Sequence, residues 1–530
     1  MNLINFILDN NEKSRTQNSL LNFATGIGGR LLSMLLQFLT RTVFIATLSV
    51  TYLGINGVFS NVLTLLSLTE LGFGTAIGFK LYKPLAENDV PRTRLLMKFY
   101  KQAYIIVGVV IFIIGLLMIP TLPFLIKGYE ELTLLKIDAV AVFLLYLLQS
   151  VSTYWFFAYR TAIVEAAQRK YVLDIIDYAI SILTCIVQIT ILLVWHNFML
   201  YIASVIFFNL FRNGTNAYFA TKMFPNIFVR DENSISWTEV KEIVKDCMAI
   251  FVYKVNGVVL TASDNLVLSK FIGLTIVGLY SNYLIIFSSL KGLLKQIYMA
   301  VKPSMGNLYA TDSIEKKYLM FEVMNLLTVA FYGIGMILIS VTSNEFVRLW
   351  IGDEYTIPQP FPFLIGLELF VDGMKANLGQ IRDVSGAFRQ MWFRPILAVI
   401  INLIVSISLV KYCGIYGVII GTIVADLSTN IAIDPIIIHR FSFSGEKQAV
   451  KYYRKNFLYM LVATGVCFAD IYICIFIKTG FIFIDILFHF LICIISLPLL
   501  LYVLFGKTEE GKYIVLIVRQ QINSRIISKL

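Results

Sequence analysis

The chain has 530 residues, of which 58% are hydrophobic and 15% are charged. Soluble domains average about 45–50% apolar and about 25% charged residues, so this composition excludes an ordinary soluble globular protein and indicates a polytopic membrane protein. The formal net charge of +11 comes largely from basic residues in the turns between apolar stretches. It therefore points to membrane topology and lipid headgroups, and no nucleic-acid partner is expected.

Apolar stretches separated by polar breaks recur along the sequence, and a helix needs roughly 20 such residues to cross the hydrocarbon core. The first stretch carries Arg30 and Arg41 and has no small-residue cleavage site after a short apolar core. We therefore expect a retained span and no signal peptide. The pattern predicts an all-α polytopic membrane protein with about fourteen transmembrane helices. The predicted spans are residues 19–47, 52–82, 98–126, 137–159, 172–195, 198–222, 242–270, 273–302, 318–342, 361–388, 392–411, 415–439, 456–477 and 481–505.

Lysine and arginine are concentrated in alternate connections between these spans. By the positive-inside rule, this bias predicts a multi-pass protein with both termini in the cytoplasm. A linker between two six-helix lobes is expected after the sixth span, and parallel lobes would be related by a pseudo-two-fold axis along the membrane normal. The predicted parts are a cytoplasmic arm (1–18), an N-lobe (19–224), a cytoplasmic linker (225–241), a C-lobe (242–440), a C-terminal helix pair (455–505) and a cytoplasmic tail (506–530).

Two short patterns recur at nearly one offset. Residues Gly57-Val58-Phe59-Ser60-Asn61 return as Gly278-Leu279-Tyr280-Ser281-Asn282, 221 positions later. Arg160 and Gln168 are echoed by Arg382 and Gln390, each 222 positions later. Duplicated halves in a membrane protein are typical of transporters whose lobes rock about a central site.

Charged residues inside the predicted spans lie on common helix faces. Each costs about 2.5–3.5 kcal/mol at the centre of a bilayer on insertion scales, so a lipid-facing position is unfavourable. The span at 361–388 has the most continuous polar face, at steps of three and four residues, and we expect that face to lie against protein or water. Its members are Glu368, Asp372, Lys375, Gly379, Arg382 and Gly386.

These faces predict a hydrated basic cavity that binds a multiply charged anion, because lysine and arginine supply charge and guanidinium adds bidentate contacts to phosphate oxygens. An embedded carboxylate either pairs with a nearby base, as Asp372 with Lys375, or takes up a proton or sodium ion when the cavity reorients. Candidate residues are Arg30, Arg41, Lys254, Lys291, Lys375 and Arg382 for the anion, Gln37, Tyr280 and Asn265 for sugar hydroxyls, and Glu70, Asp264 and Asp372 for the coupling ion.

No catalytic pattern emerges from the sequence, so an enzyme is not expected. Walker A, paired CxxC, HExxH and GxSxG motifs are missing, which gives no support for ATP-driven transport, a metal site or any cofactor. The histidines His196, His439 and His489 lie at or near the ends of different spans. The six cysteines are scattered without metal-ligand spacing and are expected to pack as small polarizable side chains.

Residues 15–505 resemble the oligosaccharide-lipid flippases of the polysaccharide export family (Wzx type). The superfamily of that family also holds multidrug exporters and peptidoglycan-precursor flippases. Besides the span count and the two halves with a trailing pair, local segments carry the resemblance. These are Thr51-Tyr52-Leu53-Gly54 leading to Gly57-x-Phe59-Ser60-Asn61, Glu70-Leu71-Gly72-Phe73-Gly74, Asp264-Asn265-x7-Gly273-x4-Gly278-x-Tyr280, and the segments at Arg160 and Arg382.

The resemblance implies a V-shaped pair of six-helix bundles in a bacterial plasma membrane. It implies that undecaprenyl-pyrophosphate-linked oligosaccharide repeat units move by alternating access to the outer leaflet, for capsule, O-antigen or exopolysaccharide synthesis, with ion antiport in some members. By position, Arg30, Arg41, Lys254 and Arg382 could hold the pyrophosphate. Implied partners are membrane lipids and the glycosyltransferases and polymerase of the same pathway.

Two other functions remain open on the sequence. A multidrug or metabolite cation antiporter would share this fold, although a basic cavity would repel cations. A membrane glycosyltransferase or polymerase would need a sizeable external loop with a cluster of carboxylates, arginines or histidines, and the predicted external connections are short.

Overall fold

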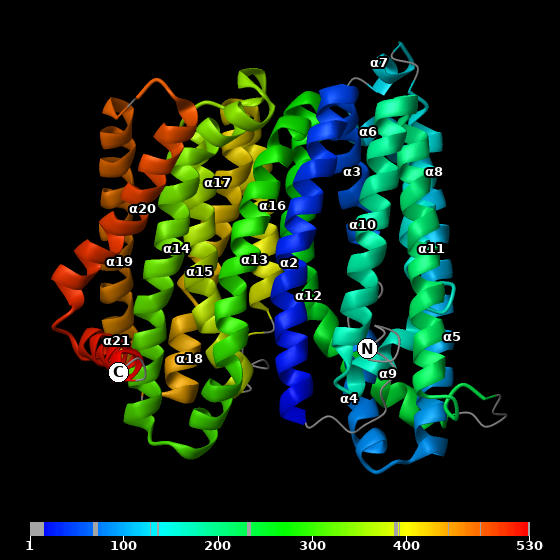
Figure 1. Ribbon diagram of the computed structural model, residues 1–530, viewed down its shortest axis with the longest axis horizontal. Coiled ribbons are helices and arrows are strands. Elements are labelled where there is room, and N and C mark those ends of the chain that lie inside the picture. Colours follow the sequence, from blue (N-terminus) through cyan, green and yellow to red (C-terminus); the bar gives the residue numbers. More distant parts are fainter. Residues whose placement is uncertain are drawn as a thin grey trace. The chain divides into compact units, whose positions relative to one another are not determined.

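The computed structural model describes residues 15–66, 73–127, 129–134, 137–229, 235–385, 391, 393–443, 445–477 and 479–527 (Figure 1). Within these ranges every regular element is a helix and no strand occurs, which confirms the predicted all-α class. The chain divides into two compact units, Met1–Gly278 and Leu279–Leu530. The lobe boundaries expected from the sequence remain a prediction.

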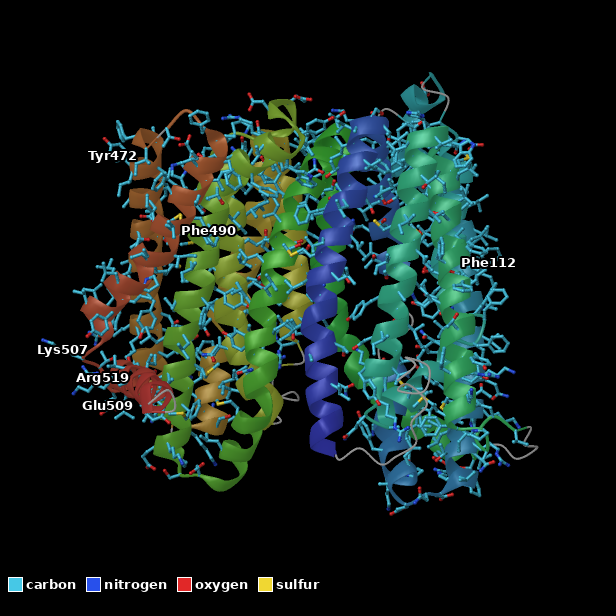
Figure 2. All side chains as sticks on the ribbon, viewed as in Figure 1. Phe112, Tyr472, Phe490, Lys507, Glu509 and Arg519 are labelled. Carbon is cyan, nitrogen blue, oxygen red and sulfur yellow. The ribbon has the colours of Figure 1, made fainter. Side chains whose placement is uncertain are left out.

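Each predicted span overlaps one long helix or a run of two or three consecutive helical segments, as residues 98–126 do with α5 (Val90–Met118), the short turn Ile119–Thr121 and α6 (Leu122–Leu125). Among the described residues, nine helices are long and apolar enough to cross a membrane. Others, such as α3 and α8, are shorter, and α15 carries the charged stripe. Figure 2 shows Phe112, Tyr472 and Phe490 projecting from the apolar helices, while Lys507, Glu509 and Arg519 lie around the last helix. This distribution fits helices surrounded by lipid.

The first unit is built from α2 to α12. In it α2 packs on α10, α3 on α12, α8 on α11, and α4 on α5 and α9. Their bounds are α2 Arg15–Thr47, α3 Val50–Leu66, α4 Phe73–Ala86, α5 Val90–Met118, α6 Leu122–Leu125, α7 Tyr129–Leu134, α8 Ala139–Ser152, α9 Thr161–Ala166, α10 Lys170–Trp195, α11 Phe198–Met223 and α12 Trp237–Phe271.

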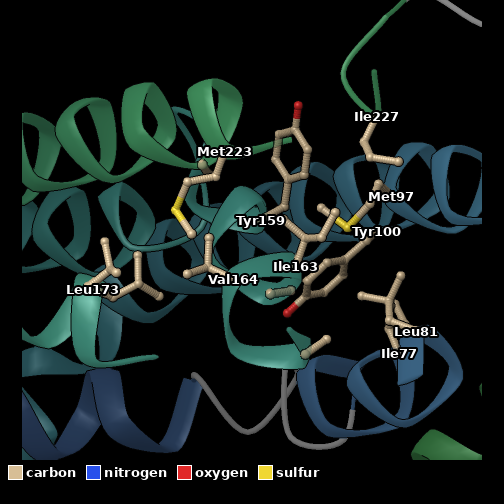
Figure 3. Close-up of a cluster of buried hydrophobic side chains, with 14 of the residues drawn as sticks. Ile77, Leu81, Met97, Tyr100, Tyr159, Ile163, Val164, Leu173, Met223 and Ile227 are labelled. Carbon is tan, nitrogen blue, oxygen red and sulfur yellow. The ribbon is translucent and has the colours of Figure 1, made fainter. Parts of the chain in front are cut away.

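A cluster of apolar side chains holds one end of this unit together (Figure 3). Ile77 and Leu81 of α4 meet Met97 of α5 and Ile163 of α9, all nearly inaccessible to solvent. The chain enters α5 through a capped start, where the carboxylate of Asp89 accepts a hydrogen bond from the backbone of Arg92 at 2.9 Å. Because caps satisfy backbone donors that the helix cannot, they fix where these helices begin.

The second unit contains most of α13 and all of α14 to α21. Here α14 packs on α15, α19, α20 and α21, while α15 packs on α17 and α18 and α16 packs on α17. The bounds are α13 Leu274–Thr311, α14 Ile314–Ile351, α15 Phe361–Ser385, α16 Arg394–Cys413, α17 Ile415–Asp426, α18 Asp434–Ser442, α19 Glu446–Phe476, α20 Ile482–Phe505 and α21 Glu509–Ile527. The predicted cytoplasmic tail thus contains a helix.

The two copies of the repeated glycine pattern begin in segments that touch each other within the first unit. A Cβ atom added to Gly57 of α3 would lie 3.0 Å from a Val277 methyl carbon, and one added to Gly278 would lie 2.7 Å from the carbonyl oxygen of Val50. A Cβ at Gly54 would overlap the backbone of Leu274. Glycine is therefore required at Gly54 and Gly278, where the neighbouring backbone is too close for a Cβ atom, whereas a side chain at Gly57 would have to displace the Val277 methyl group.

Candidate functional site

Lysines and carboxylates from three helices of the second unit form a connected cluster. Lys291 of α13 lies 3.0 Å from a carboxylate oxygen of Asp372 on α15, and Lys375, one turn later on α15, lies 2.9 Å from the other oxygen. Lys375 also contacts Asp426, the last residue of α17, at 3.0 Å. Each lysine of the cluster thus has a carboxylate within direct contact, which offsets much of the desolvation cost of a charge inside the bundle.

The cluster continues where the helix after α17 changes its winding. Residues Leu427–Ile431 form a π-helical segment, and Asn430 in it donates a hydrogen bond to Asp426 at 2.5 Å. The buried guanidinium of Arg394 donates to the side-chain oxygen of Asn430 and pairs with Asp434 at 3.1 Å. Wider turns of this kind frequently occur at functional sites, and here the turn directs Asn430 between two charged groups.

The face of α15 that bears Asp372 is continuous with polar groups on its neighbours. Glu368, one turn before Asp372, lies within electrostatic range of Lys291. Further along α15, Gln380 donates a hydrogen bond to the backbone of Tyr298 on α13 at 2.9 Å. The charged stripe predicted for this span therefore faces protein, as a lipid-facing helix could not carry it.

The predicted anion-binding residues of the first unit occupy different environments. Arg30 on α2 is exposed, as is Gln37 on the same helix. Arg41 is buried, with 9% of its surface exposed, and lies within electrostatic range of the phenols of Tyr146 on α8 and Tyr201 on α11.

Tyr146 links this arginine to α3, because its hydroxyl donates a hydrogen bond to the Asn56 side chain at 2.6 Å. Arg41 of α2 is thus a buried cation close to tyrosine phenols of α8 and α11. Phenols can accept hydrogen bonds from a guanidinium without adding charge.

The remaining candidates on α12 and before it are less completely described. Asp264 and Asn265 on α12 are both buried. The side chain of Lys254 and the whole of Glu70 lie outside the described residues.

In the second unit, Tyr280 of α13 is buried against Phe361, with ring centres 6.0 Å apart. Arg382 of α15 is half-buried and lies within electrostatic range of Asp434. The second unit therefore brings together Lys291, Lys375, Asp372 and Arg382, while Tyr280 packs in an aromatic contact. Pairing of Asp372 with Lys375, one of the two predicted alternatives, is found.

Sequence reasoning missed the role of Arg394. It was assigned to no site, although the Arg394-Pro395 pair marks the start of α16. Asp426 and Asp434, which bracket the π-helical segment, were likewise assigned to no site. An interruption of regular winding between two embedded carboxylates leaves no composition signal, so the contact of Arg394 with both Asn430 and Asp434 could not be inferred.

A second ionic cluster ties α21 to the bundle of the second unit. Lys455 of α19 contacts Glu322 of α14 and, at 2.8 Å, Glu510 of α21. Tyr459 also donates to Glu510 at 3.5 Å. Burial alone would raise the pKa of Glu510, but the hydrogen bond and the charge of Lys455, together with hydrogen bonds from the backbone and from Thr508, lower the pKa overall.

No group of three or more histidine, cysteine, aspartate and glutamate side chains that could hold a metal ion occurs among the described residues. The charged clusters are therefore built from ion pairs and hydrogen bonds alone in this part of the chain.

No protein-family model matches the sequence, and no curated protein matches it. Solved structures with a similar fold include "Lipid II flippase MurJ, inward closed conformation", with a TM-score of 0.60, 14% identity, and coverage of 92% of this chain and 99% of that chain.

Another is an inward-facing multidrug resistance MATE family transporter of the MOP superfamily, with a TM-score of 0.52 and 15% identity, and the match covers 79% of this chain and 98% of that chain. A structure of the MATE multidrug transporter DinF-BH has a TM-score of 0.56 and 16% identity, and the match covers 79% of this chain and 96% of that chain. At these identities the likeness concerns the fold alone.

Proposed function

We propose that this protein is a membrane flippase that moves polyprenyl-pyrophosphate-linked oligosaccharide repeat units from the cytoplasmic to the outer leaflet by alternating access. The observation that carries the proposal is the extent of the likeness to the lipid II flippase, which covers 92% of this chain and 99% of that one. The multidrug transporters cover 79% of this chain. A fold can host several functions, so the substrate has to be argued from the side chains.

Basic side chains in membrane-spanning helices support an anionic substrate. Arg41 is held among tyrosine hydroxyls in the first unit, and α15 of the second unit carries Lys375 and Arg382 on one face. Guanidinium groups match the paired oxygens of a pyrophosphate better than ammonium groups do. We therefore assign the main anion contacts to Arg30, Arg41 and Arg382.

The lysines of the second unit have a different task in this proposal. Lys291 and Lys375 already contact Asp372 and Asp426, so an arriving anion has to compete with carboxylates for them. Such an exchange of partners would couple substrate binding to the packing of α13, α15 and α17. An ion taken up by Asp372 when its lysines turn to the substrate would make transport ion-dependent.

The test is a flipping assay in vesicles that contain the purified protein and a fluorescent polyprenyl-pyrophosphate oligosaccharide. Accessibility of the label to a membrane-impermeant quencher reports the leaflet in which the lipid lies. We expect protein-dependent flipping, and single alanine substitutions at Arg30, Arg41 and Arg382 are each expected to slow it about tenfold or more, as loss of a charge-assisted contact does.

Arg212→Ala is the matched control, because Arg212 pairs with Asp177 at 3.5 Å outside the proposed contacts. Wild-type rates in all three alanine variants would remove the site assignment. Vesicles that exchange cationic dyes for protons or sodium but leave the glycolipid in place would favour the alternative, a multidrug or metabolite cation antiporter of the same fold.

A further inference from the structure

An apolar groove runs along α5 beside the start of α12 in the first unit. It encloses about 500 Å³. Side chains of α5 from Leu95 to Val110 line it at steps of three and four residues, so one face of that helix forms the wall. Trp237, Val240 and Val244 of α12 form the opposite wall.

Polar contacts at one end hold the two walls together. Arg92 in the first turn of α5 forms an ion pair with Glu239 in the first turn of α12. Arg94 donates a hydrogen bond to the carbonyl oxygen of Asn226, in the connection before α12, at 2.8 Å. The groove is therefore fixed by the fold of the unit, and the small side chain of Ala103 leaves room along α5.

Positive charge and an aromatic ring lie at the same end as these contacts. Lys98 lines the groove, and the ammonium of Lys241 lies 5.9 Å from the centre of the Trp237 ring. Trp237 is 70% exposed. Among the described residues at the start of α12, Glu239 forms its ion pair with Arg92, and Glu242, five residues after Trp237, lies on the opposite side of the helix from the groove.

We propose that this groove binds an anionic phospholipid as a resident ligand. One acyl chain would lie along α5, where the apolar walls exclude water, and the phosphate would lie between Lys98 and Lys241. Tryptophan favours the headgroup level of a bilayer, which places Trp237 beside the same phosphate. The basic mouth selects an anionic headgroup over a zwitterionic one. The site is separate from the proposed pyrophosphate contacts and does not depend on flipping.

The first test uses Trp237 as the reporter. The sequence contains five tryptophans, and replacing Trp155, Trp195, Trp350 and Trp392 with phenylalanine leaves Trp237 alone. Phospholipids with brominated acyl chains quench tryptophan on contact. Brominated phosphatidylglycerol is expected to quench Trp237 at several-fold lower mole fraction than brominated phosphatidylcholine.

Substitutions at the mouth of the groove give the control. Lys98→Gln with Lys241→Gln is expected to abolish the preference for phosphatidylglycerol. Lys101→Gln removes a lysine from the opposite side of α5 and is expected to preserve it. Equal quenching by the two lipids, or an equal loss in the Lys101 variant, would overturn the proposal.

Native mass spectrometry of the full chain with all its tryptophans provides a second readout, in case the reporter variant fails to fold. Delipidated protein is titrated with phosphatidylglycerol, and Ala103→Phe, which fills the groove, is expected to remove one tightly retained lipid. Undiminished retention in the Ala103→Phe variant would refute the groove as the binding site. If phosphatidylcholine displaced the retained lipid as well as phosphatidylglycerol does, the preference for an anionic headgroup would be refuted.

Discussion

Embedded charges are handled differently in the two compact units. In the second unit, Lys291, Asp372, Lys375 and Asp426 contact one another across three helices. In the first unit, the buried Arg41 lies among tyrosine rings. The cluster in the second unit is held by contacts between opposite charges, while the neighbours of Arg41 include two uncharged phenols.

The two units should therefore be destabilised by different kinds of substitution. A buried ion pair adds little net stability when complete, but removing one partner leaves an uncompensated charge. Phenols near a cation stabilise it as dipoles and add no opposite charge of their own. The second unit should therefore be the more sensitive to single charge removal, and the first unit the more sensitive to loss of close packing.

Lys375→Ala should lower the free energy of unfolding more than any other substitution considered for the two units. Removal of this lysine leaves the buried carboxylate of Asp426 without its cation, while Asp372 keeps its contact with Lys291. Leaving a buried charge unpaired costs about 3–5 kcal/mol. Unfolding of the purified protein in detergent, followed by tryptophan fluorescence, measures the change. Adding Asp426→Asn to the variant is expected to recover part of the loss.

Two control variants separate this effect from a general effect of removing a basic residue. Lys295→Ala removes an exposed lysine from α13, one turn after Lys291. Arg212→Ala removes the partner of Asp177 in a pair that is about one-third exposed. Both should cost about 1 kcal/mol or less. A loss in Arg212→Ala as large as in Lys375→Ala would end the distinction between the units.

Gly54→Ala tests the close packing of the first unit and should lower the free energy of unfolding by an intermediate amount. The added methyl would overlap the backbone of Leu274, and backbone cannot move aside as a flexible side chain can. We expect a loss of about 1–3 kcal/mol, the usual cost of overpacking, in the same unfolding assay.

Gly214→Ala on α11 is the matched control, because nothing lies within 4 Å of the position that its Cβ would take. It should be neutral or add up to about 1 kcal/mol through helix propensity. Equal stability of the two alanine variants would show that the α3 contact is not tightly packed.

Much of the helical framework could be predicted because its signal is local. The polar face of α15 was inferred from residue spacing alone, and its Asp372–Lys375 pair is one turn apart in the sequence. The partner Asp426 could not be assigned, because it reaches Lys375 from a helix 51 positions later. Long-range choice of partner depends on packing, which spacing within a single helix does not encode.

The contact between Gly57 and Val277 illustrates the same limit. The repeated glycine pattern was visible in the sequence and was taken as a sign of duplicated halves. The close packing of α3 at Gly57 against the start of α13 at Gly278 could be seen only from the backbone positions. The C-terminal region likewise gave no sequence signal that Glu510 would anchor a helix to Lys455.

Glu510→Gln should have the smallest effect, because it changes only the attachment of α21 to the second unit. Loss of the charge-assisted contact with Lys455 is expected to cost about 1–2 kcal/mol. Faster tryptic cleavage at Lys512 measures release of the helix. Since the pKa of Glu510 is lowered from 4.5, the contact contributes fully above that pH and is lost as the pH falls through the folded-state value. Wild-type protein should then approach the behaviour of the variant. Glu509→Gln alters an exposed neighbour, so cleavage as fast as in Glu510→Gln would mean that the ion pair does not hold α21.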